Sequence, residues 1–436
     1  MEAQIPTVDE VASAEVTPKP APEYVLELVQ KARSAAGRMA SLSTAIKDRA
    51  LIAMADGLAA NAEDILAANE KDLEAFGSSK DTQAMADRLR LTPERIEAMA
   101  AGIREIVKLV DPVGQTLSMR RRPNGMQVGR VRVPIGVIGI IYESRPNVTA
   151  DSAALCLKSG NACVLRGGSE AIHSNTAIAA VLSDAAEHAG VPAGAITFID
   201  RTERDVVTEL LKQDHYIDLI IPRGGESLMK TVTEQSRIPV IKHDKGVCHV
   251  YIDADADVAM AKAIAANAKV QRPSTCNAME TLLVHQNSAR AVLPELVNEL
   301  ATAGVEVRGC AKTVSLCPEA KPAEESDYGQ EFLSLILAVK VVRNIEEAME
   351  HIARYGSRHT EAIVTQDYGR AMRFVREVDA GAVLVNASTR LNDGNQFGLG
   401  AEIGISTTRI HARGPMGLEE LTCSKFVVLG SGQIRE

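Results

Sequence analysis

Apolar segments alternate with helical segments between residues 136 and 252, and this alternation constrains the fold more than any other feature. Gly136–Tyr142 is a continuous apolar run, and Thr149–Leu157 after it has the spacing of a helix. Strands that alternate with helices form a parallel sheet covered on both faces, and such sheets bind ligands beyond the carboxyl ends of their strands. The further segments of this pattern are the expected strands Ala162–Leu165, Ala195–Ile199, Ile217–Ile221 and Val247–Ile252, and an expected helix at Ser169–Ala189.

The flanking residues predict a helical region, a hairpin and a second α/β region. Apolar residues recur at helical spacing from Tyr24 to about Val110, and Asn124-Gly125 between a basic run and an alternating segment predicts a β-hairpin. A second α/β region extends from about Lys262 to Ile410. Its expected strands are Ala278–Val284, Leu335–Val342, Glu361–Thr365 and Ala382–Val385, and a last strand is expected at Ser424–Leu429.

Composition excludes several classes of protein. The 436 residues carry a formal charge of −9, contain no Trp and only 3% aromatic residues, so nucleic acid is an unlikely main partner. The seven cysteines form no CxxC pair, which fits a reducing, cytoplasmic protein without a metal site. No apolar run is long enough for a membrane span. Residues 1–22 are acidic and Pro-containing, and they predict a mobile tail.

Cys276 is the candidate nucleophile among the cysteines. Cys156, Cys163 and Cys248 lie in apolar helix or strand segments, where a buried, inert thiol is expected. Cys276 lies instead in the polar segment Gln271–Ala278 between an expected helix and strand, and loops on a rigid scaffold are common sites for nucleophiles. Local sequence alone leaves a nucleophile and an inert loop thiol equally open.

Two turns that follow strands have the composition of phosphate-binding turns. Arg166-Gly167-Gly168-Ser169 and Arg223-Gly224-Gly225 each join an expected strand to a helix, with Ser169 as the expected N-cap of its helix. The glycines let backbone N–H groups approach a phosphate, and an arginine offers a forked charge. Either turn alone is weak evidence, but the two together indicate a dinucleotide, although GxGxxG is absent.

Longer segments resemble one known family. Val133–Ile140, Tyr142–Thr149, Lys158–Ala162, the loop around Cys276 and Phe397–Leu418 are similar to the gamma-glutamyl phosphate reductases of the aldehyde dehydrogenase superfamily. The resemblance implies an α/β fold with a Rossmann-like cofactor domain, an α/β catalytic domain and a small β oligomerisation hairpin. The implied parts are an NADPH-binding domain at 23–110 and 134–245, a catalytic domain at 246–410, and oligomerisation segments at 111–133 and 411–436.

The resemblance also implies roles for single residues. Cys276 takes the role of nucleophile. Arg166, Gly168 and Ser169 lie near the adenosine ribose; because NAD-preferring relatives often carry Glu at the position of Ser169, Ser beside Arg favours NADPH. Relatives contact the pyrophosphate at the positions of Gly224, Gly225 and Ser227 and the nicotinamide ribose at that of Glu331. A solvated glutamate is the plainer interpretation of Glu331.

The implied reaction is the NADPH-dependent reduction of L-glutamyl 5-phosphate through a thioester on Cys276, in proline biosynthesis. The thiol pKa is expected below about 8.5 through nearby cations or backbone dipoles. Candidates for holding the amino acid end are Arg145, then Arg390 and Glu402. The backbone N–H of Cys276 and the side chain of Asn147 are candidates for stabilising the oxyanion.

Two alternatives stay open at this point: a hydrolytic NAD(P)-dependent aldehyde dehydrogenase, and a non-catalytic scaffold relative. Hydrolytic relatives carry a Glu-Leu-Gly-Gly-Lys motif whose glutamate activates water, whereas residues 241–249 here contain no glutamate. Because an acyl phosphate is short-lived in water, a glutamate 5-kinase is an expected partner. The implied assembly is a homo-oligomer, either a dimer or a tetramer.

Overall fold

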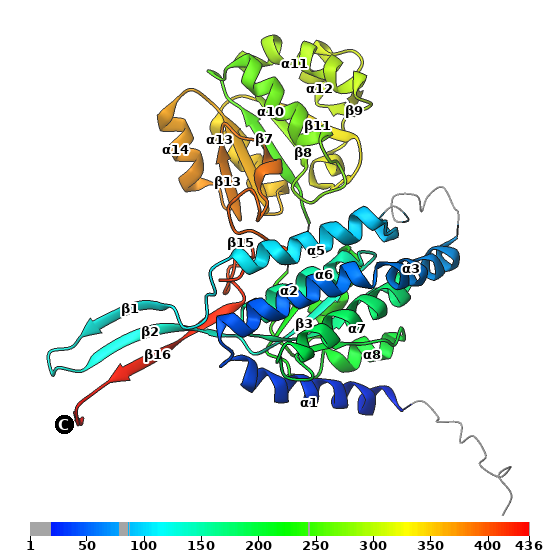
Figure 1. Ribbon diagram of the computed structural model, residues 1–436. Helices are drawn as coiled ribbons and strands as arrows, with labels where there is room; N and C mark the ends of the chain where they lie inside the picture. Colours follow the sequence, from blue (N-terminus) through cyan, green and yellow to red (C-terminus); the bar gives the residue numbers. More distant parts are fainter. Residues whose placement is uncertain (1–18, 78–85, 87, 243–244, 436) are drawn as a thin grey trace, which may run out of the picture.

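The computed structural model describes residues 19–77, 86, 88–242 and 245–435. Two parallel sheets, each covered by helices, form two stacked bodies, and a long antiparallel arm projects from one of them (Figure 1). This confirms the expected α/β fold, which consists of two α/β units and a small β hairpin. None of the described helices is long and apolar enough to cross a membrane.

The first sheet has four parallel strands in the order β5-β4-β3-β6. The chain runs outward from β3 through β4 to β5 and then returns to place β6 on the other side of β3. The carboxyl ends of β3 and β6 therefore lie next to each other where the strand order reverses, the usual place for a ligand in this type of sheet. The strands are β3 (Val137–Tyr142), β4 (Ala162–Arg166), β5 (Ile196–Phe198) and β6 (Leu219–Arg223).

Helices cover both faces of this sheet because β3 is apolar on both sides. Ile138 and Ile140 of β3 belong to the larger core, whereas Val137 and Ile141 belong to the core on the opposite face. The helices of the larger core are α2 (Thr44–Ala60), α3 (Ala62–Phe76), α5 (Pro93–Lys108), α6 (Asn147–Lys158) and α7 (Ile172–His188). Those of the other face are α1 (Ala21–Met39), α8 (Arg204–Leu210) and α9 (Glu226–Gln235).

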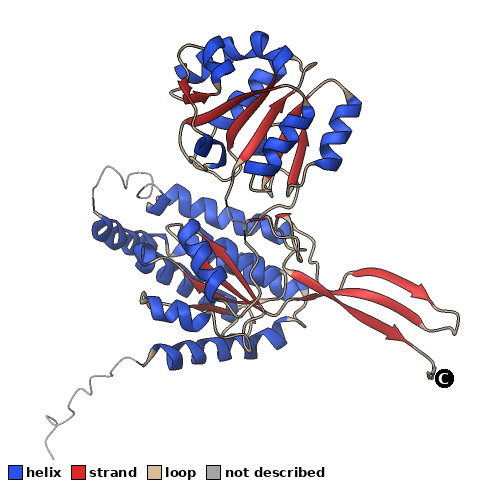
Figure 2. Cartoon of the chain, turned by 180° about the vertical axis from the view of Figure 1, so that it is seen from behind, coloured by secondary structure: helices blue, strands red, loops and turns tan. Residues whose placement is uncertain are grey.

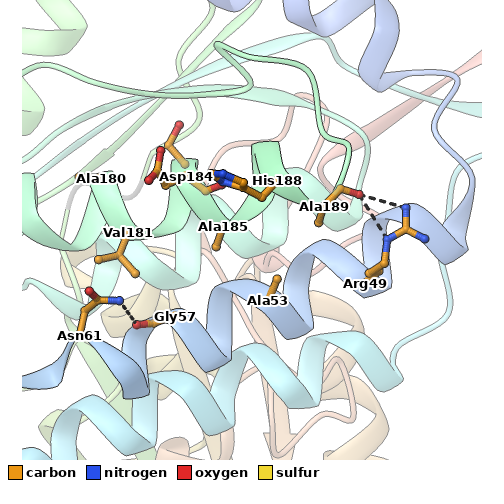
Figure 3. A pocket seen from close by; sticks show the side chains of 11 residues that line it. Arg49, Ala53, Gly57, Asn61, Ala180, Val181, Asp184, Ala185, His188 and Ala189 are labelled. Carbon is orange, nitrogen blue, oxygen red and sulfur yellow. Dashed lines mark hydrogen bonds between the residues drawn. The ribbon is translucent and has the colours of Figure 1, made fainter.

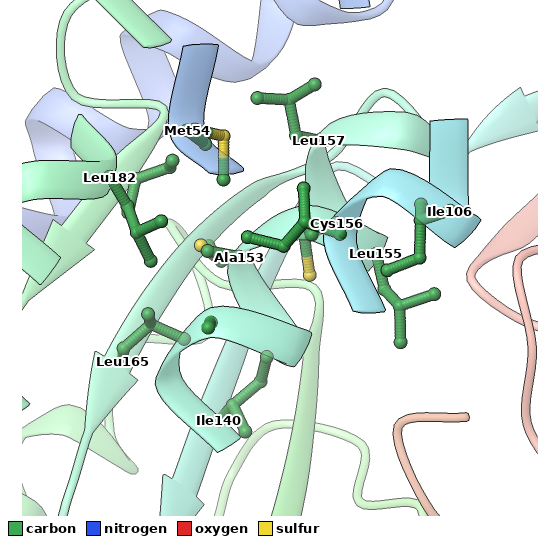
Figure 4. Packing of buried hydrophobic residues seen from close by; sticks show 14 of the residues in the cluster. Met54, Ile106, Ile140, Ala153, Leu155, Cys156, Leu157, Leu165 and Leu182 are labelled. Carbon is green, nitrogen blue, oxygen red and sulfur yellow. The ribbon is translucent and has the colours of Figure 1, made fainter. Parts of the chain in front are cut away.

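Helix α6 is buried along its whole length in the larger core. Figure 4 shows Leu155, Cys156 and Leu157 of α6 among Met54, Ile140 and other apolar side chains. Each such buried side chain stabilises the fold by about 1.5–3 kcal/mol relative to an exposed one. This packing fixes the amino end of α6, which follows β3 at the edge where the ligand is expected.

The second sheet has seven parallel strands in the order β10-β9-β11-β8-β7-β12-β13. Helices α10 (Val258–Val270), α11 (Gln286–Thr302) and α12 (Ala311–Leu316) cover one face, and α13 (Ile345–Tyr355) and α14 (Tyr368–Glu377) cover the other. The strands are β7 (Cys248–Ile252), β8 (Met279–His285), β9 (Glu306–Gly309), β10 (Lys321–Pro322), β11 (Ile336–Val342), β12 (Thr360–Val364) and β13 (Ala382–Val385).

The arm has three antiparallel strands, β1 (Thr116–Arg121), β2 (Gln127–Pro134) and β16 (Thr422–Leu429), which Figure 2 shows extending away from both bodies. The predicted hairpin turn is confirmed: Gly125 has a φ of 88°, and the Asn124 side chain accepts a hydrogen bond from the Met126 N–H at 3.2 Å. Strand β16 pairs with β2 along its length.

Most expected elements are confirmed, with four differences. Strands β9 and β10 and the small pair β14 (Ile405–Ser406) and β15 (Gly414–Pro415) were not expected. Helix α1 begins at Ala21, so the last residues of the expected tail are helical, while residues 1–18 lie outside the described residues. Ser169 does not cap a helix with its side chain; a short 3-10 turn begins there. Ile403, placed in the catalytic domain by sequence, packs in the core of the first sheet.

Candidate active site

Cys276 lies in the connection between α10 and β8, before the amino end of β8, and charges of Arg145 and Arg223 from the first unit act on its thiol. Two contacts hold its neighbours: the Arg390 guanidinium donates to the side chain of Asn277, and the Asn277 amide donates to the Asn392 carbonyl at 3.0 Å. Arg390 also donates to the side chain of Gln271 at 2.8 Å. Arg390 therefore orders the loop that presents the thiol.

The residues before β7 pack against the back of this loop. The Cys248 thiol donates to the Cys276 carbonyl at 3.1 Å, and the Gly246 N–H donates to the Glu331 carboxylate at 2.9 Å. A Cβ at position 246 would overlap the backbone of Cys276. The nucleophile candidate and Glu331 are thus fixed to the same short segment. Cys156, Cys163 and Cys248 are buried, as predicted for inert thiols.

Four charged side chains act on the Cys276 thiol. Its pKa is raised to about 11, mainly by burial and in part by the charges of Glu331 and Glu402, while the charges of Arg223 and Arg145 oppose the rise. The expectation of a pKa below about 8.5 is therefore wrong for the cofactor-free protein. The reason is that withdrawal from water outweighs the two guanidinium charges.

Arg145, Arg223 and Glu402 come from three different segments and meet beside Cys276. Burial, with the neighbouring charges of Arg223, Arg88 and Arg272, lowers the pKa of Arg145 to about 10. Arg223 lies against the backbone of Gly404, whose φ is 148°. The expectation that Arg223 faces a cofactor phosphate is therefore not supported; it faces the thiol.

Glu402 helps to hold the loop around Gly394 beside Cys276. Its carboxylate accepts a hydrogen bond from the Gly394 N–H at 2.8 Å. Burial raises the pKa of Glu402, and the charge of Arg223 lowers it. The structure therefore brings all three substrate-binding candidates, Arg145, Arg390 and Glu402, around Cys276.

The two glycine turns lie at the carboxyl edge of the first sheet, after β4 and β6. The Gly225 N–H, expected on a phosphate, donates to the Glu143 carboxylate at 2.8 Å, while Ser227 lies exposed in the first turn of α9 and Gly224 precedes it. After β4, Arg166 donates to the Thr202 carbonyl at 3.2 Å, followed by buried Gly168 and exposed Ser169. The Glu143 carboxylate therefore already accepts the hydrogen bond of one N–H group that was expected to bind a phosphate.

The Gly224-Gly225 turn belongs to the first unit and Glu331 to the second, and the two lie near each other. Burial raises the pKa of Glu331, Gly246 and Lys245 oppose the rise, and Glu226 of α9 adds to it. Lys245 also contacts Glu226 at 3.6 Å. Glu331 of the second unit is thus a neighbour of the helix that the Gly224-Gly225 turn begins, which suits one ligand held between them.

Asn147 and an arginine-lined cavity lie on the other side of Cys276. The amide of Asn147 donates to the Asp151 carboxylate at 3.1 Å, so it is not aimed at the thiol in this structure. Both line a cavity of about 480 Å³ that reaches Ser274 and Thr275, directly before Cys276. Sequence reasoning named Arg145 but missed Asp151 and the other arginines of this cavity, because they are brought together from distant segments: Arg88, Arg90, Arg95 and Arg272.

Another cavity, of about 830 Å³, contains none of the candidate site residues. Figure 3 shows it as a groove between α2 and α7 with small residues at its base, where Arg49 donates to the Ala189 carbonyl and Asn61 to the Gly57 carbonyl. The cavity is open because many of the side chains that line it between the two helices are small. No cluster of three or more potential metal ligands occurs among the described residues.

Comparison with known proteins places this site in a family. Residues 4–327 match the aldehyde dehydrogenase family. The gamma-glutamyl phosphate reductase of Thermodesulfovibrio yellowstonii is 56% identical over 414 residues, which cover 95% of this chain and 99% of that relative. The crystal structure of gamma-glutamyl phosphate reductase from Thermotoga maritima superposes with a TM-score of 0.92 at 46% identity, covering 94% of this chain and 100% of that one.

The chain belongs to the gamma-glutamyl phosphate reductases of the aldehyde dehydrogenase family. The predicted resemblance is therefore confirmed, and the relatives support neither the hydrolytic nor the scaffold alternative. More distant structures share the fold alone: an acetylating aldehyde dehydrogenase from Geobacillus thermoglucosidasius is 21% identical, with a TM-score of 0.69 and coverage of 95% of this chain and 98% of that one.

Proposed function

We propose that this chain reduces L-glutamyl 5-phosphate to L-glutamate 5-semialdehyde with release of phosphate, through a thioester on Cys276. The observation that carries the proposal is the position of the thiol, presented by an ordered loop between the two sheets with Arg145 and Arg223 as its cationic neighbours. A sulfur is a strong nucleophile and a good leaving group, so it suits both halves of the reaction.

In the first half, the Cys276 sulfur attacks the acyl carbon and forms the C–S bond while the bond from carbon to the phosphate oxygen breaks. Phosphate leaves with the electron pair of that bond. Arg145 and Arg223 stabilise the negative charge of the thiolate and of the departing phosphate, because both guanidinium groups lie where these charges develop. The buried thiol is protonated at neutral pH, so attack also requires transfer of its proton, for which the phosphate group that leaves is the available acceptor.

The second half needs a hydride at the thioester carbon, which NADPH would supply when bound. The resulting thiohemiacetal loses its C–S bond, which releases the aldehyde and restores the thiolate. The backbone N–H of Cys276 remains the candidate donor to the carbonyl oxygen. Asn147 is the weaker candidate, since its amide is engaged by Asp151.

The residues that would hold NADPH fit a dinucleotide with an extra phosphate. Arg166 offers a guanidinium beside Gly168, and exposed Ser169 leaves room for a 2′-phosphate where a glutamate would repel it. Gly224, Gly225 and Ser227 at the start of α9 would hold the pyrophosphate, once the Glu143 carboxylate has left the Gly225 N–H. Glu331 would hold the nicotinamide ribose.

The test is the reverse reaction, followed as NADPH formation from semialdehyde, phosphate and NADP⁺. The wild type is expected to require phosphate, and Cys276→Ala to lose at least about a thousandfold in rate while it still binds NADP⁺. Cys423→Ala, a thiol on the exposed arm, is the matched control and should behave as wild type. Phosphate-independent formation of the acid would support a hydrolytic enzyme, and full activity of Cys276→Ala would end the proposal.

The assembly and setting of the enzyme follow from the same proposal. The arm exposes apolar side chains that a second subunit would cover: Leu117, Met119, Phe426, Val428 and Leu429. We therefore expect a homo-oligomer, dimer or tetramer, built through this arm. We also expect a cytoplasmic enzyme supplied by a glutamate 5-kinase, because its substrate decays in water.

A further inference from the structure

The cavity beside Cys276 carries an unusual balance of charge for its size. Five guanidinium groups line its volume of about 480 Å³, together with one carboxyl group, Asp151. Such a cavity favours a ligand that is negative overall and also carries one cationic group. A plain polyanion would satisfy the arginines but would be repelled by Asp151.

The cavity adjoins the loop that carries Cys276. Ser274 and Thr275 form part of its wall, and Cys276 follows them directly. Arg145 lines the cavity, and its pKa responds both to Arg88, which also lines the cavity, and to Cys276. A substrate whose carbonyl lies at the sulfur can therefore extend its other end into the cavity without leaving the reach of Arg145.

Asp151 is held in place but is not paired with a cation by hydrogen bonds. It lies on the first turns of α6, whose deep packing fixes its backbone, and its carboxylate accepts a hydrogen bond from the neutral amide of Asn147 at 3.1 Å. Burial raises the pKa of Asp151 to about 6, and the charge of Arg223 opposes the rise. An ammonium group from a ligand would supply the missing charge.

We propose that this cavity binds the α-amino acid end of the substrate, with Asp151 accepting the α-ammonium group and the surrounding arginines holding the α-carboxylate. The inference rests on the proposed function and extends it from Arg145 to a whole subsite. L-Glutamyl 5-phosphate has the required charges, an anion overall with one ammonium, and two methylene groups join its reacting carbonyl to its α-carbon. Asp151 is thus a specificity-determining residue.

The arginines divide this work by position. Arg145 lies between the cavity and the thiol, so it is shared by the carboxylate and the reacting end. Arg88 donates to the Ser274 carbonyl at 3.2 Å and so joins the cavity wall to the loop of Cys276. Occupation of the cavity by an amino acid carboxylate would therefore order the same loop that presents the sulfur.

The test compares two aldehydes in the phosphate-dependent reverse reaction: L-glutamate 5-semialdehyde and 5-oxopentanoate, which lacks only the amino group. Wild type should prefer the amino aldehyde. Asp151→Asn keeps the size of the side chain and its contact with Asn147, and should lower kcat/KM for the amino aldehyde by about tenfold to a hundredfold. Its kcat/KM for 5-oxopentanoate should stay within about twofold, which also shows that the variant is folded and competent.

The matched control is Asp184→Asn, a carboxylate in the groove between α2 and α7 (Figure 3), which should leave both values unchanged. Comparing the ratio of the two substrates between variants cancels the tendency of the amino aldehyde to cyclise. An Asp151→Asn enzyme with an unchanged ratio, or with equal losses on both aldehydes, would overturn the assignment. A wild type without phosphate-dependent activity would end the proposed function, and this inference with it.

Discussion

The backbone of Gly246 lies directly against the backbone of Cys276, and the Gly246 N–H donates to the Glu331 carboxylate at 2.9 Å. One residue without a side chain therefore sets both the position of the reactive loop and the direction of the glutamate proposed to hold the cofactor. A Cβ at this position would have to displace backbone atoms, which cannot move aside as the end of a flexible side chain can.

We predict that Gly246→Ala displaces the Cys276 loop and lowers kcat by about a hundredfold, because displacement of reacting groups by about 1 Å costs that much. Steady-state kinetics of the reverse reaction measure the change. Gly37→Ala is the matched control: a Cβ at position 37 of α1 has no atom within 4 Å, so this variant should keep its activity and gain about 0.5–1 kcal/mol in stability. Normal kcat in Gly246→Ala would show that the contact yields without cost.

The raised pKa of Cys276 predicts a steep pH dependence of its alkylation. The thiolate is the reacting form, and a pKa of about 11 leaves the thiol protonated at neutral pH. Labelling of Cys276 by iodoacetamide in the cofactor-free protein should therefore accelerate about tenfold per pH unit from pH 7 to 9.5 without a plateau. Peptide mass spectrometry separates this thiol from the other six.

The direction of the cationic effect can be tested in the same experiment. Arg145 lowers the pKa of the thiol, so Arg145→Gln should raise that pKa and slow labelling at any pH in this range. Arg376→Gln, on the exposed end of α14, is the control and should label as wild type. A plateau near pH 8 in the wild type would mean that the thiol is already activated without ligand.

Sequence alone predicted the layers of the fold because their signals are local. Strand β3 is apolar on both faces, and the Asn124-Gly125 turn needs only its own residues to form. Pairing of β16 with β2 was not predictable in this way, since their partners are almost 300 residues apart in the chain. Strand β10 has two residues and β9 (Glu-Val-Arg-Gly) has one apolar side chain, so neither contains the apolar run by which the other strands were recognised.

For the site, the resemblance identified Cys276 and the candidate substrate-binding residues around it. It did not predict how burial and the neighbouring charges change the pKa of the thiol. The rise of the thiol pKa depends on burial and on Glu331 and Glu402, which only the folded chain brings to the loop. Arg223 was assigned to a phosphate turn because of the glycines after it, yet its side chain lies against Gly404. Where a side chain points from the end of a strand is decided by packing rather than by the local motif.

Glu143 is predicted to compete with the cofactor. Its carboxylate occupies the Gly225 N–H, a proposed donor to the pyrophosphate, so it has to move before a phosphate binds there. Glu143→Ala should therefore tighten NADP⁺ binding by about threefold to tenfold, measured by calorimetry or fluorescence titration, since hydrogen bonds of this kind contribute about 1 kcal/mol. Glu234→Ala, exposed near the end of α9, is the control. Weaker binding would instead make Glu143 a ligand of the cofactor.

Arg166 and Ser169 are predicted to set the preference for NADPH. Ser169→Glu would place a carboxylate beside the proposed 2′-phosphate, and should lower the ratio of kcat/KM for NADPH to that for NADH by about a hundredfold or more. Arg166→Gln should reduce the same ratio by about tenfold, mainly through a higher KM for NADPH. Arg201→Gln, another arginine near this edge, is the control and should leave the ratio alone. An unchanged ratio in both variants would place the 2′-phosphate elsewhere.

The buried ion pair of Lys269 and Glu280 is predicted to stabilise the second sheet in a pH-dependent way. Both side chains are fully buried and 2.5 Å apart, and burial raises the pKa of Glu280 to about 7 from its usual 4.5. Lys269→Met leaves the carboxylate without a counter-charge, so unfolding in urea at pH 8 should show a loss of about 3–5 kcal/mol. Because the pKa of Glu280 is higher in the folded state, this group stabilises the folded state most below pH 4.5. Its contribution to the free energy of unfolding is lost as pH rises past 7. The loss should therefore be smaller at pH 6, where Glu280 is protonated. Lys262→Met removes an ion pair with the exposed Glu295 and leaves that carboxylate in water, so it should cost less than about 1 kcal/mol at either pH.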